Sequence, residues 1–321
     1  MEISRVAKWN HLHPQTLEKQ YKEHLSDFLE WEQNVDETAL LYPENFGERM
    51  SLDETALHNG DLYTILTNKD GHGKKGSLAA LIKGTKNGVI SKVLEKISIQ
   101  KRMAVKEITI DLAQNMDWIC RTNFLNATLV ADRFHVQQVV SEAVQEIRIN
   151  LRREAIDREN ALIVEARNRK ISFWSQRFSN GDTEKQLLAR SRYLLFKPYN
   201  KWTETQKERA GILFERYPEL KKAYDLSLLF RGIFETAKTG ENAKKRFEEW
   251  FEKISVSKIP SLISASNTIQ NNLGKILNYF LNRSTNASAE SFNAKLKGFR
   301  SLVRGVTDIK FFLFRISTFY A

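Results

Sequence analysis

The sequence predicts an α/β protein built on a mixed sheet, in which three antiparallel strands are followed by two parallel ones. Residues 49–82 contain three short β-rich runs separated by turn residues, which is typical of antiparallel strands. Residues 105–136 contain two further β-rich runs, and each ends in an aspartate and leads into a segment with helical spacing. Nothing alternates between about residues 170 and 280, which predicts an all-helical insertion.

Residues 1–40 have helical spacing, and we assign residues 1–46 to a short helical N-terminal segment. The helical pattern breaks at residues 10–13, and Pro14 is well placed as the first residue of a second helix. Two interpretations remain open. The segment forms a helix-turn-helix, or it forms an amphipathic helical hairpin that packs on the main domain.

The first part of the sheet is predicted as an antiparallel meander. Ser51–Ala56 and Leu62–Thr67 flank Asn59-Gly60, the dipeptide most typical of a tight hairpin. A polar loop leads from the second strand to a third strand at Leu78–Ile82. Alternation within the first strand places Asp53 on one face and Glu54 on the other.

The parallel part follows a crossover helix at about residues 89–97. A strand ends at Asp111, a helix occupies about residues 116–124, and the next strand ends at Asp132. This order is that of a ribonuclease-H-like mixed sheet, with Asp53 on its first strand and Asp111 on its fourth. We assign residues 47–165 to the first part of this core.

The helical insertion is assigned to residues 166–280. It is broken at Lys197-Pro198, Tyr217-Pro218 and Ile259-Pro260. Aromatic residues recur through it at helical spacing, and they serve either as its core or, less commonly, as platforms on which bases stack.

Residues 281–321 are assigned to a C-terminal helical part of the core. Thr285–Ser288 can cap a helix whose first turn holds Glu290. Three apolar residues form the buried stripe of this helix, and three polar residues share another face. The stripe consists of Phe292, Leu296 and Phe299, and the polar face of Glu290, Asn293 and Lys297.

The composition favours a polyanionic partner. Lysine and arginine total 50 against 39 acidic residues, a formal net charge of +11 at pH 7, which suits nucleic acid first and an anionic membrane surface second. Cys120 is the only cysteine, which excludes an intrachain disulfide and a cysteine-based zinc cluster and favours a reducing cytoplasm. The sequence has no signal-peptide pattern and no apolar run long enough to predict a transmembrane helix.

Asp53, Asp111 and Glu290 are the candidate catalytic and metal-binding residues. Cutting or joining a phosphodiester needs an activated hydroxyl or water and a neutralised leaving oxygen, and two Mg²⁺ ions about 3.5–4 Å apart can supply both. In such a site Asp53 would bridge the ions, and Asp111 and Glu290 would each hold one. The alternatives are structural roles. Each aspartate could be a turn residue or a helix cap, and Glu290 could interact favourably with the dipole of its helix.

Four motifs occur in an order that resembles the DDE transposases of bacterial insertion sequences, in the group marked by an Asp-Arg-Phe-His strand. They are Leu52-Asp-Glu-Thr55, Ile110-Asp-Leu-Ala113, Ala131-Asp-Arg-Phe-His-Val136 and Asn286-Ala-Ser-Ala-Glu-Ser-Phe-Asn293. The resemblance implies a ribonuclease-H-like catalytic core with Asp53, Asp111 and Glu290 as the DDE triad. It also implies Mg²⁺ with Mn²⁺ as a substitute, strand cleavage, and strand transfer by the freed 3′-hydroxyl. Asp132 and His135 match a motif expected to support the site.

The implied substrate is double-stranded DNA, both the element ends and the target, bound by a homodimer in the bacterial cytoplasm at the nucleoid. The candidate phosphate contacts are Lys74, Lys75, Arg148, Arg152, Lys297 and Arg300. Only about 48 residues precede the catalytic part, so recognition of the element ends falls to residues 1–30, to a second polypeptide or to a part missing from this chain. Two alternatives remain: a catalytically inactive DNA-binding relic or regulator, and a ribonuclease-H-like nuclease without strand transfer.

Overall fold

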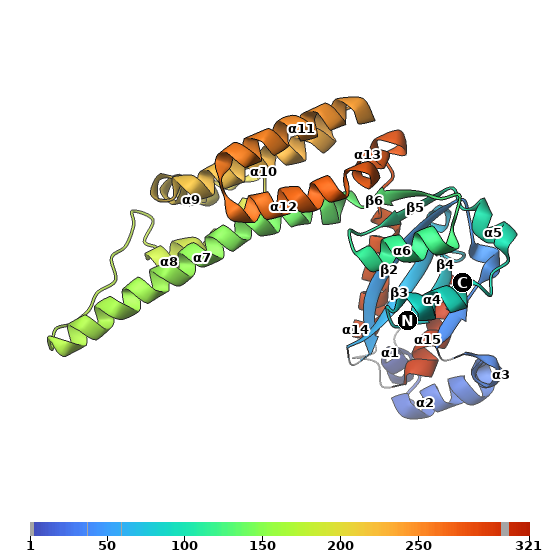
Figure 1. The fold of residues 1–321 in the computed structure, drawn as a ribbon. Coiled ribbons are helices and arrows are strands. Elements are labelled where there is room, and N and C mark those ends of the chain that lie inside the picture. The colour runs from blue at the N-terminus through green and yellow to red at the C-terminus, as the bar shows by residue number, and fades with distance from the viewer. Residues whose placement is uncertain (1–2, 37, 59, 303–307) are drawn as a thin grey trace. The chain divides into compact units, whose positions relative to one another are not determined.

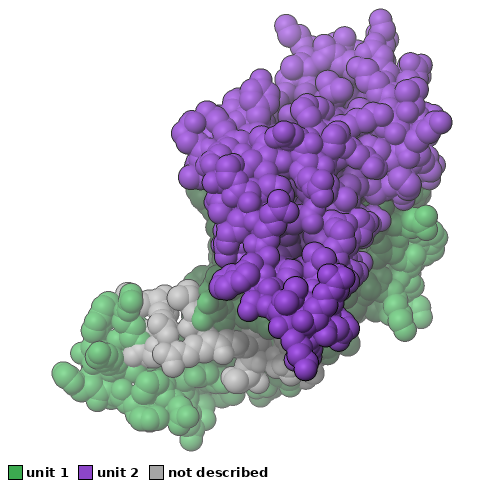
Figure 2. Space-filling view, turned by 90° about the vertical axis from the view of Figure 1, so that its left-hand side faces the viewer, with its two compact units in different colours: residues 1–132, 283–321 green, residues 133–282 purple. Residues whose placement is uncertain are grey.

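The computed structural model describes residues 3–36, 38–58, 60–302 and 308–321 (Figure 1). The chain divides into two compact units, shown in Figure 2. The sheet unit comprises Met1–Asp132 and Arg283–Ala321, and the helical unit comprises Arg133–Asn282. The catalytic core expected from the sequence ran on to residue 165, whereas the compact unit that holds the sheet ends at Asp132. The difference arises because one uninterrupted helix, α7 (Arg133–Asn168), begins directly after the last strand.

The sheet has six strands in the order β1-β4-β3-β2-β5-β6. Antiparallel pairing joins β1, β4, β3 and β2, and parallel pairing joins β2 to β5 and β5 to β6. This confirms the predicted α/β class with its mixed sheet. The strands are β1 (Ala39–Leu41), β2 (Arg49–His58), β3 (Asp61–Asn68), β4 (Leu78–Lys83), β5 (Glu107–Ile110) and β6 (Thr128–Ala131).

Strand β1 was not expected, because residues 1–40 were interpreted as helical. Ala39–Leu41 pairs with β4 and extends the sheet at its edge. The predicted hairpin at Asn59-Gly60 joins β2 to β3; Asn59 lies outside the described residues, and Gly60 has a φ of 87°, which favours glycine.

Helices cover both faces of the sheet (Figure 1). Met50 and Leu52 of β2 point to the face on which α4 and α6 pack, and share a buried apolar cluster with them. Leu57, also on β2, belongs to a second cluster, formed with α14 and α15 on the opposite face. The helices after β4 are α4 (Asn87–Leu94), α5 (Ile99–Ala104) and α6 (Gln114–Asn123), and those of the C-terminal segment are α14 (Ala287–Leu302) and α15 (Ile309–Tyr320).

The N-terminal segment packs on α15. It contains α1 (Ile3–Trp9), α2 (Pro14–Gln20), a π-helical turn at Tyr21–Leu25 and α3 (Phe28–Asn34). Pro14 begins α2, as predicted. The Phe28 ring of α3 meets Phe311 of α15 edge to face, with centroids 5.2 Å apart. This packing agrees with the interpretation of a helical hairpin docked on the main domain.

The helical unit contains α7 and six further helices. Pro218 and Pro260 begin α10 and α12, and Pro198 precedes a 3₁₀ turn, so all three predicted breaks are confirmed. The helices are α8 (Glu184–Arg190), α9 (Glu204–Arg216), α10 (Pro218–Thr236), α11 (Gly240–Ser257), α12 (Pro260–Asn271) and α13 (Leu273–Asn282). None of the helices in the described ranges is long and apolar enough to cross a membrane.

Many of the aromatic residues form the core of the helical unit, the first of the two roles considered for them. Phe230 and Trp250 are fully buried, and their ring centroids lie 4.7 Å apart. Trp174 is different, because 86% of its surface is exposed. The aromatic residues therefore include a packed set, with Phe230 and Trp250 on α10 and α11, and exposed side chains such as Trp174 beyond the end of α7.

Candidate active site

Asp53 of β2 and Asp111, the residue directly after β5, lie at corresponding positions along two neighbouring parallel strands. The β2–β5 register pairs Ser51 with Thr109, and each aspartate follows its paired residue by two positions. Side chains two positions apart on a strand point to the same face, so both aspartates belong to the face that bears Ser51 and Thr109. The structure therefore brings these two predicted acids together at the point where β2 and β5 separate.

Asp132 adds a third aspartate at the same edge of the sheet. It follows Ala131, which is the partner of Ile110 in the β5–β6 register, and its backbone N–H donates to the Ile110 carbonyl at 2.8 Å. Its side chain is 1% exposed, and its Oδ1 accepts a 3.4 Å hydrogen bond from the backbone of Asn286. Asp132 thus ties β6 to the residue that immediately precedes α14.

The Glu54 carboxylate lies on the other face of β2, as alternation predicted. Its Oε1 accepts a hydrogen bond of 2.9 Å from Nδ2 of Asn115 on α6. The two neighbouring acids of β2 are therefore separated by the sheet, and only Asp53 faces α14.

Helix α14 lies along β2 and runs in the same direction. Asn286, directly before the helix, is hydrogen-bonded through its side chain to the hydroxyl of Ser51. Further along, Asn293 donates to Asp53 at 2.6 Å. Near the end of α14, Arg300 donates to the Ala56 carbonyl at 3.4 Å.

Glu290 lies between the first two of these contacts. It is exposed, and its backbone N–H donates to the Asn286 carbonyl at 2.8 Å, which forms the first turn of α14. The helix begins at Ala287, two residues earlier than expected, because Asn286 and not Ser288 precedes its first turn. The structure therefore places Glu290 on a helix that covers the face bearing Asp53.

Backbone and amide hydrogen bonds orient the two strand aspartates. Asp53 accepts from its neighbour's N–H, that of Glu54, at 2.8 Å through Oδ1 and from Asn293 through Oδ2. Asp111 accepts from the N–H of Ala113 at 2.8 Å, just before α6 begins. A backbone N–H group therefore fixes the orientation of each carboxylate.

The carboxylates of Asp53, Asp111 and Glu290 are suitable ligands for a hard divalent cation, which prefers carboxylate oxygens. In the described part of the chain, however, no three His, Cys, Asp or Glu side chains are grouped closely enough to hold a metal ion, so the structure does not bring Asp53, Asp111 and Glu290 together as one metal site. Asp53 and Asp111 supply two carboxylates on one face, and the bracketing of Glu290 by Asn286 and Asn293 keeps the third on the same side of the sheet.

His135 belongs to the helical unit. It lies in the first turn of α7, is partly buried, and packs edge to face against Phe134 with ring centroids 5.7 Å apart. Its expected supporting role stays a prediction.

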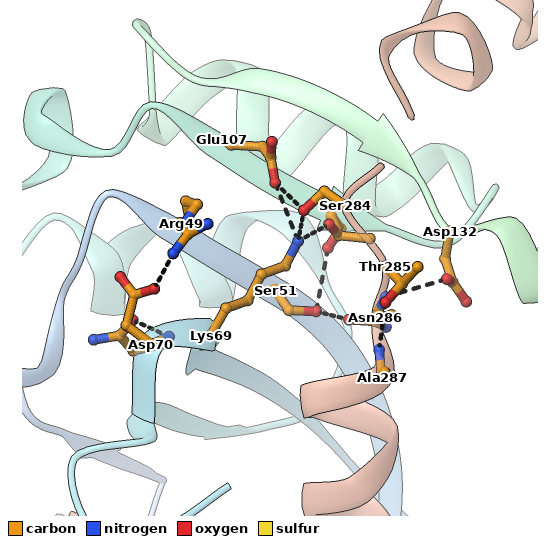
Figure 3. Close-up of polar contacts among 12 residues, drawn as sticks. Arg49, Ser51, Lys69, Asp70, Glu107, Asp132, Ser284, Thr285, Asn286 and Ala287 are labelled. Carbon is orange, nitrogen blue, oxygen red and sulfur yellow. Dashed lines mark hydrogen bonds and ion pairs between the residues drawn. The ribbon is translucent and has the colours of Figure 1, made fainter. Parts of the chain in front are cut away.

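Lys69 is a buried residue that no sequence pattern singles out. Its Nζ donates to Glu107 at 3.1 Å, to Ser284 at 2.7 Å and to the hydroxyl of Thr109 (Figure 3). Burial lowers the pKa of Lys69, and the charge of Glu107 opposes that shift. A lysine in a polar, glycine-rich loop predicts an exposed side chain, and only the tertiary fold turns this one inward.

The candidate phosphate contacts differ in exposure. Lys74, Lys75 and Lys297 in the sheet unit are exposed, as is Arg152 on α7, whereas Arg300 is partly buried and donates to a backbone carbonyl. Arg148 is a correction. It is 6% exposed and its guanidinium donates to Gln145 at 2.6 Å and to the Leu188 carbonyl at 3.0 Å. Burial inside the helical unit removes it from the set that can reach DNA.

Comparison with known families supplies one match. A family model described as "Transposase", of the DDE type named for ISL3, matches residues 50–316. No curated protein and no solved structure matches the chain. The matched range begins at β2 and ends within α15, so it includes every residue assigned above to the candidate site.

Proposed function

This chain belongs to the ISL3-type family of DDE transposases, and on that premise we propose that it cuts DNA at the ends of an insertion sequence and joins the freed 3′ ends to a target. The family implies DNA as the substrate. The chemical part of the proposal rests on one observation. Asp53 of β2 and Asp111, directly after β5, lie at corresponding positions on the face that α14 covers, with Glu290 in the first turn of that helix.

The proposed ligands of the divalent ions are Asp53, Asp111 and Glu290. When bound, Mg²⁺ or Mn²⁺ supplies charge neutralisation at the leaving oxygen and favours ionisation of the attacking hydroxyl. The backbone N–H groups of Glu54 and Ala113 orient the carboxylates of Asp53 and Asp111, respectively. Asn293 orients the second oxygen of Asp53, and Asp132 fixes the residue before α14.

Exposed cations near the site supply the proposed phosphate contacts. Lys74 and Lys75 lie in the loop between β3 and β4, and Lys295 of α14 donates to the Gly73 carbonyl of that loop at 2.5 Å. This contact joins the loop to α14, which also carries the exposed Lys297. These exposed lysines, on α14 and on the loop that it contacts, are the proposed contacts for the DNA backbone.

A cleavage assay with the Asp111→Asn variant tests the proposal. The substrate is a plasmid that carries the element's own ends, incubated with the purified chain and either Mg²⁺ or Mn²⁺. We expect nicks at the element ends and joined products, and we expect Asp111→Asn to lower their yield by more than about a hundredfold, beyond what removing an outer partner of a metal ligand costs. Asp70→Asn is the matched control, because Asp70 is exposed and pairs on the surface with Arg49 at 2.6 Å.

The products separate the remaining alternatives. Nicks without joined products would indicate a nuclease that lacks strand transfer. Specific binding without nicks, in both metals, would indicate a DNA-binding regulator and contradict the proposed chemistry. Pairing of two element ends requires two active sites, so we also propose a homodimer on DNA. The mass of the protein–DNA complex, measured by light scattering, tests this. If the purified chain alone does not select the element ends, a separate polypeptide recognises them.

A further inference from the structure

We infer that Lys69 and Ser284 are positioning residues that anchor the start of α14 to the sheet and thereby set the place of Glu290. The inference rests on the proposed function, since it gives these residues a role only through the triad. Neither side chain touches the candidate carboxylates.

The anchor is a cluster of four polar side chains, three of them buried and the fourth, Ser284, partly buried; Figure 3 shows Lys69, Glu107 and Ser284. Lys69 comes from the loop after β3, Glu107 and Thr109 from β5, and Ser284 from the segment before α14. The Lys69 and Glu107 side chains are 10% and 7% exposed, and Ser284 also donates to the Glu107 carboxylate. Burying the Lys69–Glu107 pair costs the desolvation of both charges, so this pair is weak evidence for a purely stabilising role. We therefore look for a structural role in the residues that it contacts.

Ser284 is connected to Glu290 through Asn286. Two residues later, Asn286 binds Ser51 through its side chain and Asp132 through its backbone N–H. The carbonyl of Asn286 then accepts the N–H of Glu290. Lys69 is thus connected to Glu290 by Ser284 and Asn286, each of which is held to a different strand.

The anchor lies on the N-terminal side of Glu290, before the contacts that Asn286 makes with Ser51 and Asp132. A second attachment, between Asn293 and Asp53, comes one turn after Glu290. With both in place, the first turn of α14 is fixed at each side of Glu290. Without the anchor, Asn286 still contacts Ser51 and Asp132, but the segment that leads into α14 loses its attachment to β5. The first turn can then fray more readily, as helix ends do.

The test measures the first turn of α14 directly, without DNA. Ser284→Ala removes the link and leaves the Lys69–Glu107 pair in place, and Lys69→Met removes the centre of the cluster. We expect hydrogen exchange of the backbone N–H groups of Asn286 and Glu290 to become about two- to tenfold faster in both variants, the effect of removing one hydrogen bond. Exchange in β2 and β5 should be unchanged in Ser284→Ala.

Metal binding gives a second readout. We expect the Kd for Mn²⁺, measured by calorimetry on the DNA-free chain, to rise about tenfold or more in both variants, the size of effect seen when the partner of a metal ligand is removed. Lys83→Met is the matched control, because Lys83 pairs with Asp61 at 2.9 Å on the surface of the same sheet, with about half of each side chain exposed (51% and 43%). It should leave both exchange and Mn²⁺ binding at wild-type values.

If Lys69→Met fails to fold because Glu107 is left buried and unpaired, Ser284→Ala and the double variant Lys69→Met/Glu107→Gln carry the test. Wild-type exchange and Mn²⁺ binding in Ser284→Ala would overturn the inference, even with cleavage intact. Failure of the proposed function is distinguishable: a wild-type chain that cuts no DNA, while Ser284→Ala still speeds exchange at Asn286 and Glu290, refutes the chemistry and keeps the anchor.

Discussion

Asn293 of α14 donates a 2.6 Å hydrogen bond to the carboxylate of Asp53, although 240 positions separate the two residues in the sequence. This contact joins the C-terminal segment to the central strand of the sheet at one of the candidate catalytic acids. It also occupies a carboxylate oxygen that the proposed metal site would use, which makes Asn293 the most sensitive position at which to test that site.

Asn293→Asp should shift the acid limb of the cleavage pH profile upward by about one pH unit or more. The substitution places a second carboxylate within hydrogen-bonding distance of Asp53, and two carboxylates that close share a proton, which raises the pKa of one of them. The measurement is the initial cleavage rate from pH 5 to 9 at saturating Mg²⁺. Asn115→Asp is the matched control, because Asn115 donates to Glu54 on the opposite face; an equal shift there would show that the effect is not specific to the site.

The exposed lysines should determine how strongly DNA binding depends on salt. Removing one phosphate-binding lysine should reduce the slope of log Kd against log salt concentration by about 0.9. We expect a reduction of this size for Lys297→Ala and for each of Lys74→Ala and Lys75→Ala. Fluorescence anisotropy with a labelled duplex at several salt concentrations measures the slope. Arg121→Ala, which removes an exposed cation paired with Asp117 on α6, should leave it unchanged.

Asp182 should make the helical unit sensitive to acid. The side chain is fully buried; burial alone would raise its pKa, but hydrogen bonds and ion pairs with Arg209, at 3.0 Å, and with Arg190 lower it overall. The unfolded value is 3.8, so this stabilisation is complete above about pH 4 and is lost as the pH falls through the lower folded pKa.

Asp182→Asn should therefore lower the free energy of unfolding at pH 7 by about 2 kcal/mol, less than a fully buried pair because Arg190 is 57% exposed. Urea denaturation at pH 7 and at pH 3 tests this. The two proteins should converge as the pH falls, and a constant difference between them would contradict the assignment of this pH dependence to Asp182.

Two tryptophans of the helical unit, Trp250 and Trp174, should behave in opposite ways. Trp250 is 2% exposed and donates to the Leu226 carbonyl at 2.9 Å, so Trp250→Ala should lower the stability of the helical unit by about 3–5 kcal/mol. Trp174→Ala, at an exposed position, should change it by less than about 0.5 kcal/mol. Denaturant unfolding followed by circular dichroism distinguishes them. A loss of DNA affinity in Trp174→Ala alone would favour a stacking role for that side chain.

The sheet was predictable because its signals are local. Strand lengths, turn dipeptides and the aspartates after β5 and β6 lie within a few residues of one another, and the same alternation correctly separated Asp53 from Glu54. Short-range patterns failed where pairing is the deciding factor. Ala39–Leu41 is too short to alternate, and it forms β1 only because β4 offers an open edge.

The connections around the candidate site could not be read from the sequence for the same reason. The buried position of Lys69 depends on Glu107 and Ser284, which are 38 and 215 positions away. The burial of Arg148 depends on α8, since the Leu188 carbonyl accepts a hydrogen bond from the Arg148 guanidinium. An exposed lysine and a buried one, or an exposed arginine and a buried one, look alike until their distant partners are known.

The interruption of the sheet unit by the helical unit has a consequence for synthesis. A chain emerging from the ribosome completes β2, β5 and β6 early, then adds the 150 residues from Arg133 to Asn282 before Glu290 is made. Domains fold as units while the chain grows, but α14 and α15 are synthesised last. One face of the sheet therefore stays uncovered until these two helices have been made. A polypeptide terminated between Asp111 and Glu290 would carry two of the three proposed acids, so the proposed capacity to cut DNA would arise only near the end of translation.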